Sequence, residues 1–177
     1  MSVQILPLQN LIDLGLTPEQ MIPAYGGESA GLDLYNAGPD ITVPPAIDYG
    51  ESEAHDDQEY GTQHSKVFFK TLMPTGIKVA IPQGYVGVIV ERSSITKSVF
   101  KVRAGIVDSG YTGHVFVNFI NCSGATATLK AGEKSPFQLL VLRCDNGFCL
   151  TDEAGYAAST KTSKRQAGAI GSSDKVQ

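Results

Sequence analysis

Short apolar runs separated by turn residues constrain the fold of this chain more than any other feature. From residue 67 onwards the runs lie at 67–69, 76–81, 85–90, 115–120 and 137–142. Turn residues stand between several of them, at Pro82-Gln-Gly84 and at Lys130-Ala-Gly-Glu-Lys134. Nearer the N-terminus, further strands are expected at 3–6, 29–34 and 41–43. Several short strands in series predict an all-β chain folded as a barrel or a jelly roll.

The composition fits a single β domain that is rich in turns. The chain has 177 residues, enough to bury a core without disulfide or metal staples, and it contains 19 glycines and 9 prolines. A helix is expected only as a short turn at Thr17-Pro-Glu-Gln20, where Thr17 can act as the N-cap and Pro23 follows closely. Apolar residues become sparse beyond Thr151. We therefore expect a β domain over residues 1–160 and a flexible C-terminal tail over residues 161–177.

One internal segment, residues 46–66, differs in character from the rest of the chain. It has few aliphatic residues, and its acidic side chains are Asp48, Glu51, Glu53, Asp56, Asp57 and Glu59. Such a composition predicts a solvated loop or a mobile segment. A tolerated surface insertion is the favoured interpretation, and an acidic docking loop for a protein partner is the alternative.

Charge and cysteine usage exclude several classes of function. A net charge of −4 argues against nucleic acid as a partner, although it leaves room for a local cationic pocket that binds phosphates. No run approaches the roughly 18 apolar residues of a membrane span, and no secretory signal is recognisable. The 3 cysteines form no disulfide framework, so a reduced cytoplasmic setting is expected, or a host cytoplasm for a viral or phage chain. No zinc-ligand spacing is formed by His55, His64 and His114.

Asp108 is the strongest candidate for a catalytic side chain. It lies between two apolar runs in the stretch 103–117, and Gly105 and Ser109-Gly110 flank it, which predicts a tight hairpin with Asp108 at its mouth. A carboxylate in apolar surroundings, without an obvious cationic neighbour, is a candidate general base. Tyr111 follows three residues later, where its ring could cover a bound ligand. On spacing alone, an aspartate that caps a turn is the more common explanation.

Two other segments carry residue types that suit phosphate binding. Arg92, Ser93 and Ser94 follow an apolar run and offer a guanidinium and two hydroxyl groups, although a surface turn is the common alternative. In the tail, Arg165 precedes Gly168, Gly171, Ser172 and Ser173, a possible anion cradle whose alternative is a flexible tail. Asp33 is flanked by leucines, so we expect a buried carboxylate paired with an arginine, in a structural role or near a site.

Taken in order, these segments resemble the five motifs of the trimeric dUTP pyrophosphatase (dUTPase) family. The first is Ala30-Gly-Leu-Asp-Leu-Tyr35, the second Arg92-Ser-Ser94 and the third Gly105-Ile-Val-Asp-Ser-Gly-Tyr-Thr-Gly113. The fourth is Gly132-Glu-Lys-Ser-Pro-Phe-Gln-Leu-Leu140 and the fifth Arg165-Gln-Ala-Gly-Ala-Ile-Gly-Ser-Ser173. The resemblance covers almost the whole chain except the acidic insertion.

The resemblance implies a jelly-roll-like (β-clip) fold, a homotrimer whose C-terminal tail completes a site, and hydrolysis of dUTP to dUMP and pyrophosphate. That activity limits uracil in DNA and supplies dUMP. The cofactor implied is Mg²⁺, held mainly by the triphosphate and not directly by protein ligands. Water would attack the α-phosphorus in line, so catalysis would depend on positioning and on charge stabilisation.

The resemblance also assigns roles to residues. Asp108 would activate the attacking water, Tyr111 would pack on the deoxyribose, and uracil would be bound through the backbone of Gly105, Ile106 and Val107. The phosphates would be held by Arg92, Ser93, Ser94 and Gln138. The tail would close over the γ-phosphate and the base with Arg165, Ile170, Gly171, Ser172 and Ser173. Asp33 is expected to be structural or near the site.

Some positions depart from the family pattern. Ser94 occupies a glycine position of the second motif, a feature shared with the related dCTP deaminases, and the fourth motif has one extra residue before Gln138. In the fifth motif Gln166 replaces a glycine, and Ile170 replaces the aromatic residue that usually stacks on uracil, so we expect the tail to close less well.

Two alternative functions remain at this point. A dCTP deaminase would need a glutamate after the third motif, where this chain has Asn118, and an amide cannot serve as that base. A nucleotide-gated binding module, with the acidic insertion contacting another protein, is the non-enzymatic alternative and does not exclude catalysis.

Overall fold

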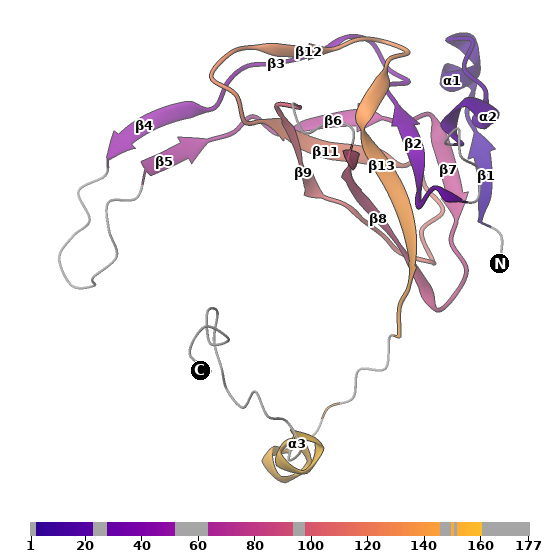
Figure 1. The fold of residues 1–177 in the computed structure, drawn as a ribbon, viewed down its shortest axis with the longest axis vertical. Coiled ribbons are helices and arrows are strands. Elements are labelled where there is room, and N and C mark those ends of the chain that lie inside the picture. Colours follow the sequence, from indigo (N-terminus) through magenta and orange to yellow (C-terminus); the bar gives the residue numbers. More distant parts are fainter. Residues whose placement is uncertain are drawn as a thin grey trace. The chain divides into compact units, whose positions relative to one another are not determined.

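The computed structural model describes residues 3–22, 28–51, 64–93, 98–145, 150 and 152–160, and it consists mainly of β-strands (Figure 1). The strands are β1 (Gln4–Pro7), β2 (Gly31–Tyr35), β3 (Ile41–Val43), β4 (Ile47–Glu51), β5 (His64–Val67), β6 (Thr71–Pro74), β7 (Ile77–Ala80), β8 (Tyr85–Glu91), β9 (Phe100–Ala104), β10 (Ile106–Val107), β11 (Phe116–Asn121), β12 (Ala127–Leu129) and β13 (Lys134–Arg143). The helices are short: α1 (Gln9–Asp13), α2 (Pro18–Met21) and α3 (Glu153–Thr160). The prediction of an all-β chain is confirmed.

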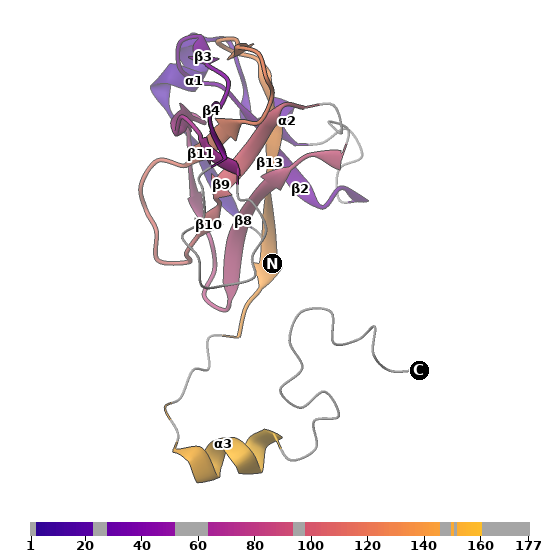
Figure 2. The same cartoon turned by 90° about the vertical axis from the view of Figure 1, so that its left-hand side faces the viewer.

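Two antiparallel sheets carry most of the fold. One has the strand order β10-β8-β13-β2, and the other has the order β6-β11-β9. The long strand β13 runs beside β8 from the pair Phe137–Glu91 to the pair Arg143–Tyr85 (Figure 2). On the neighbouring sheet, the alternate residues Val117 and Phe119 of β11 are fully buried, as expected for a strand with one face on the core. The ring of Phe119 lies 5.0 Å from that of Phe100 and 5.3 Å from that of Phe137, measured between centroids.

The N-terminal region contains one predicted helix and one that was not predicted. At α2 the backbone N–H of Thr17 donates to the Gln20 side chain over 2.8 Å, which confirms the expected capping box. Helix α1, just before it, was not expected because its sequence shows no clear apolar period. Its buried residue Leu11 joins the core and explains why this turn forms.

Two sequence-based predictions about the middle of the chain were wrong. Residues 46–66 do not form a simple loop, because β4 and β5 pair antiparallel with Ile47 opposite Val67 and Asp48 opposite Lys66. Residues 52–63 lie outside the described part. The strand expected at 67–69 is also displaced, since β5 ends at Val67 and β6 begins at Thr71.

The contacts divide the chain into two units, residues 1–145 and residues 146–177. Helix α3 belongs to the second unit, whereas the sequence analysis placed residues 153–160 in the β domain and expected no helix there. Asp152 explains its start, because its side chain accepts a hydrogen bond from the Gly155 N–H over 2.8 Å, the arrangement of an N-cap residue.

Asn36 links the loops that connect β2, β3 and β13, and its removal tests how these loops are held. The side chain is fully buried, and its amide nitrogen donates to the carbonyls of Pro39 and Lys130 over 2.8 and 3.1 Å. Asn36→Ala removes these bonds from a fully buried side chain, so we expect a loss of about 3 kcal/mol in the free energy of unfolding, measured by urea denaturation at fixed protein concentration. Asn10→Ala removes one hydrogen bond near the surface, to Ala37 over 2.9 Å, and should cost less than about 1 kcal/mol. Equal losses in the two variants would contradict this explanation.

Candidate active site

Gly105 is the point where the chain crosses from one sheet to the other. Strand β9 before it pairs with β11, whereas β10 after it pairs with β8, with Val107 opposite Gly87. The Ile89 N–H donates to the Gly105 carbonyl over 2.7 Å, and a Cβ on Gly105 would lie 2.5 Å from the Ile89 carbonyl oxygen. The predicted tight hairpin is therefore corrected: β10 and β11 belong to different sheets, because only glycine allows the close backbone approach that sends β10 to β8.

Asp108 begins the turn that follows β10, and the turn fixes the position of Tyr111. The Tyr111 N–H donates to the Asp108 carbonyl over 3.0 Å, with Ser109 and Gly110 between them. The Tyr111 hydroxyl donates to the His114 carbonyl, so the ring is held at both ends. A Cβ at Gly113 would lie 2.6 Å from the Tyr111 hydroxyl oxygen, so a side chain there would displace the Tyr111 ring from this position. We call residues 108–111 the Asp108 turn.

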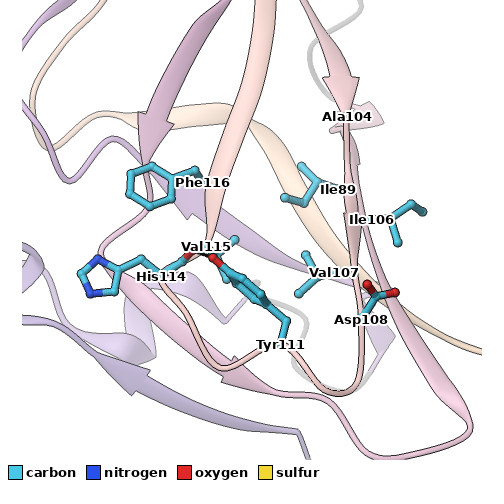
Figure 3. Close-up of a pocket in the computed structure, with 9 residues that line it drawn as sticks. All are labelled: Ile89, Ala104, Ile106, Val107, Asp108, Tyr111, His114, Val115 and Phe116. Carbon is cyan, nitrogen blue, oxygen red and sulfur yellow. Dashed lines mark hydrogen bonds between the residues drawn. The ribbon is translucent and has the colours of Figure 1, made fainter.

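A cavity of about 170 Å³ lies beside the Asp108 turn. Polar and apolar atoms both line it, and they come from Ile89, Ala104, Ile106, Val107, Asp108, Tyr111, His114, Val115 and Phe116. Figure 3 shows the Tyr111 ring extending from the turn towards His114 and Val115, with the Asp108 carboxylate at one end of the cavity and Phe116 at the other. Strand β10 is at the edge of its sheet, so its backbone is paired on one side only among the described strands. A flat ligand with polar edges fits such a site.

Asp33 forms the centre of a second group of polar residues. Its side chain is 8% exposed and accepts from Arg92 Nε over 2.8 Å and from Lys134 Nζ over 2.9 Å. The expected buried carboxylate with an arginine partner is therefore present, with a lysine in addition. The hydrogen bond from Lys134 to Asp33 raises the pKa of that lysine, so its ammonium group stays charged at neutral pH.

Gln138 completes this group, which we call the Asp33 cluster (Asp33, Arg92, Lys134 and Gln138). It lies opposite Asp33 in the register of β13 and β2, and its amide nitrogen donates to the Glu91 carbonyl over 3.2 Å. Gly31 makes room for it, since a Cβ there would lie 2.7 Å from the Gln138 Oε1. The register of β13 shifts between Lys134 and Gln138. Four residue steps of β13, from Lys134 to Gln138, face only two steps of β2, from Tyr35 to Asp33, and this irregularity sets Gln138 beside Asp33.

The Asp108 turn and the Asp33 cluster lie at opposite ends of β8. Strand β10 runs antiparallel to β8 and passes Val88 and then Gly87, so Asp108 follows at the end where β8 begins. Arg92 directly follows the other end of β8, and Gln138 lies opposite Val90. At about 3.3 Å per strand residue, the two groups are roughly 20 Å apart. Within one chain, the structure therefore does not bring Asp108 and Tyr111 together with Arg92 and Gln138.

The remaining candidate residues are placed only in part. Ser93 is exposed next to Arg92. Ser94, Arg165, Ile170, Gly171, Ser172 and Ser173 lie outside the described residues. Sequence reasoning missed Lys134 and His114. The signal available for Lys134 was its positive charge within the fourth motif, near Gln138, which was predicted to bind phosphate.

Among the described residues there is no group of 3 or more acidic, histidine or cysteine side chains that could hold a metal ion. None of the described helices is long and apolar enough to cross a membrane.

Comparisons with known proteins point to one family. The family model described as dUTPase matches residues 62–174. The deoxyuridine 5'-triphosphate nucleotidohydrolase of Mycolicibacterium vanbaalenii is 38% identical over 146 residues, which cover 78% of this chain and 79% of the relative. That of Mycolicibacterium gilvum is 34% identical over 156 residues, covering 82% and 85%. Among solved structures, a Staphylococcus bacteriophage 80alpha dUTPase variant with dUpNHpp superposes with a TM-score of 0.68 at 18% identity, covering 97% of this chain and 98% of that one.

Proposed function

The chain belongs to the dUTPase family, and on that premise we propose that it hydrolyses dUTP to dUMP and pyrophosphate. The observation that carries the proposal is the Asp108 turn, which places a carboxylate and a fixed tyrosine ring in the wall of a small cavity lined by both polar and apolar atoms. That cavity suits a pyrimidine base, and the carboxylate beside it suits the activation of a water molecule.

The base and the sugar are assigned to the Asp108 side of the site. Uracil lies along the open edge of β10, where Gly105, Ile106 and Val107 offer backbone donors and acceptors. Tyr111 packs on the deoxyribose, because its ring is half-exposed while its hydroxyl is engaged with His114. A ring held in this way excludes a bulkier sugar without any loss of its own conformational freedom on binding.

The triphosphate is assigned to the Asp33 cluster and its neighbours. Arg92, Ser93, Ser94 and Gln138 supply charged and neutral donors to the phosphate oxygens. The tail residues Arg165, Gly171, Ser172 and Ser173 close over the γ-phosphate, and Ile170 covers the base. Water attacks the α-phosphorus, Asp108 takes its proton, and the bond to the bridging oxygen breaks to release pyrophosphate. Each donor acts by holding the phosphorus in line with the water.

Mg²⁺ is the cofactor of the proposed reaction. As the family resemblance implies, the ion would be held mainly by phosphate oxygens and water and not directly by protein ligands. When bound, the ion neutralises charge on the triphosphate as the α-phosphorus is attacked. The protein contributes the arginine and the hydroxyl groups that orient the same phosphates.

A site of this kind needs more than one copy of the chain, and we assign it to a homotrimer. The Asp108 turn and Arg92 are roughly 20 Å apart in one chain, too far to act on one α-phosphate. A second copy can place its Asp33 cluster against the Asp108 turn of the first. Large apolar side chains on that side of the molecule are exposed, with Leu72 at 61%, Ile106 at 66% and Phe116 at 43%, which favours self-association. The tail, residues 161–177, then completes the site.

Pyrophosphate release is the direct test of the proposed reaction. With Mg²⁺ present, the wild-type chain should release pyrophosphate from dUTP and not from dCTP, and removal of the metal with EDTA should abolish the release. The measurement is a coupled pyrophosphate assay with parallel detection of ammonia. Ammonia released from dCTP would indicate a deaminase instead, and binding of dUTP without any release would indicate a nucleotide-gated binding module.

A further inference from the structure

We infer that Lys134 is a second substrate-binding cation for the triphosphate, held ready by the same carboxylate that orients Arg92. The inference rests on the proposed function and adds to it a residue that determines how strongly phosphates are bound. Its starting point is an imbalance of charge: one buried carboxylate, Asp33, is shared by two cations at 2.8 and 2.9 Å.

The carboxylates of the neighbouring residues Glu91 and Glu133 are directed to backbone N–H groups and not to Arg92 or Lys134. Glu91 directs its Oε1 to the Val102 N–H over 3.0 Å, on the side of β9. Glu133 directs its Oε2 to the Lys130 N–H over 2.8 Å. Asp33, Arg92 and Lys134 together therefore carry one net positive charge, at the end of β8 where the phosphates are proposed to bind. A bound anion is the natural partner of such a charge.

The exposed fractions of the three side chains indicate that Arg92 and Lys134 lie between the Asp33 carboxylate and the solvent. The side chain of Asp33 is 8% exposed, that of Arg92 is 20% and that of Lys134 is 41%. Arg92 meets Asp33 through Nε and the Ser135 carbonyl through Nη1 over 3.5 Å, which leaves further guanidinium donors. The ammonium group of Lys134 has three N–H donors, and it bonds Asp33 and the Tyr35 side chain. Lys134 also lies 5.6 Å from the centre of the Tyr35 ring, which restricts its position. Both side chains thus keep donors for a ligand while Asp33 holds them in place.

Lys130 provides an internal comparison within the same turn. It forms a one-to-one pair with Asp40 over 2.7 Å, and both side chains are well exposed, at 66% and 49%. That pair is balanced in charge and includes no second cation. Replacing either lysine by methionine removes the same charge, so Lys130→Met is a matched control for Lys134→Met.

The test compares binding of the non-hydrolysable imido analogue of dUTP with binding of dUMP, by calorimetry on the full chain. Lys134→Met should weaken binding of the analogue about tenfold or more, because a charge-assisted hydrogen bond is lost, while binding of dUMP changes less than about twofold. Lys134→Gln should show the same selective loss, and Lys134→Arg should retain most of the affinity. Lys130→Met should bind both nucleotides as the wild type does.

Two results would overturn the inference. One is equal binding of the analogue by the Lys134→Met and Lys130→Met variants. The other is an equal loss for the analogue and for dUMP with a lowered melting temperature, which would assign a purely structural role to Lys134. Pyrophosphate release by the wild type is measured separately. Binding without release would contradict the proposed hydrolysis while leaving the comparison of the lysine variants valid.

Discussion

Asp108→Asn is expected to lower kcat for dUTP hydrolysis about a thousandfold or more, while the Kd of the imido analogue changes only a few-fold. The amide has nearly the shape of the carboxylate and leaves the Asp108 carbonyl, which accepts from the Tyr111 N–H over 3.0 Å, unchanged. What the variant loses is the group that takes a proton from the attacking water. Steady-state kinetics and calorimetry on the same preparation separate the two quantities.

A matched control for this variant is Asp13→Asn. Asp13 is exposed at the end of α1, where it accepts a hydrogen bond from the Gln9 side chain over 2.8 Å, and it has no place in the proposed site. Its kcat should equal that of the wild type. Full activity in the Asp108→Asn variant would remove Asp108 from the reaction and with it the main support for the proposed mechanism.

Local signals in the sequence were sufficient for several of the strands and for one end of the site. The all-β, jelly-roll-like fold is confirmed, and β3 begins and ends where the run 41–43 predicted. Asp33 is buried and paired with Arg92 as expected, because a carboxylate flanked by leucines in a strand must find a cation when it is buried. Each of these predictions depends on residues close to one another in sequence.

Other features depend on long-range pairing that the sequence does not display. The switch of the chain at Gly105 follows from its contact with Ile89, on a strand sixteen residues earlier, and no local pattern distinguishes it from an ordinary hairpin turn. Likewise, β4 and β5 pair although residues 52–63 separate them in the sequence. The acidic composition of residues 46–66 gave no signal for either strand. The separation of Asp108 from Arg92 also emerges only once β10 is placed beside β8.

Because Asp108 and Arg92 are far apart within one chain, we expect one inactive variant to rescue another in a mixed oligomer. If each site takes its Asp108 turn from one copy and its Asp33 cluster from another, Arg92→Gln and Asp108→Asn damage different contributions to the same site. Arg92→Gln leaves Asp33 paired with Lys134, so the fold should survive the change. A mixed oligomer can then contain sites in which both contributions are intact.

The central claim, that one dUTP is hydrolysed by residues from different copies of this chain, is tested most directly by unfolding the two variants together and refolding them in equal amounts. Each variant refolded alone should be almost inactive. Random assembly should restore about one quarter of the wild-type rate of pyrophosphate release, because each contribution is intact with a probability of about one half. No recovery in a mixture shown by native mass spectrometry to contain mixed oligomers would contradict the claim and place the whole site within a single chain.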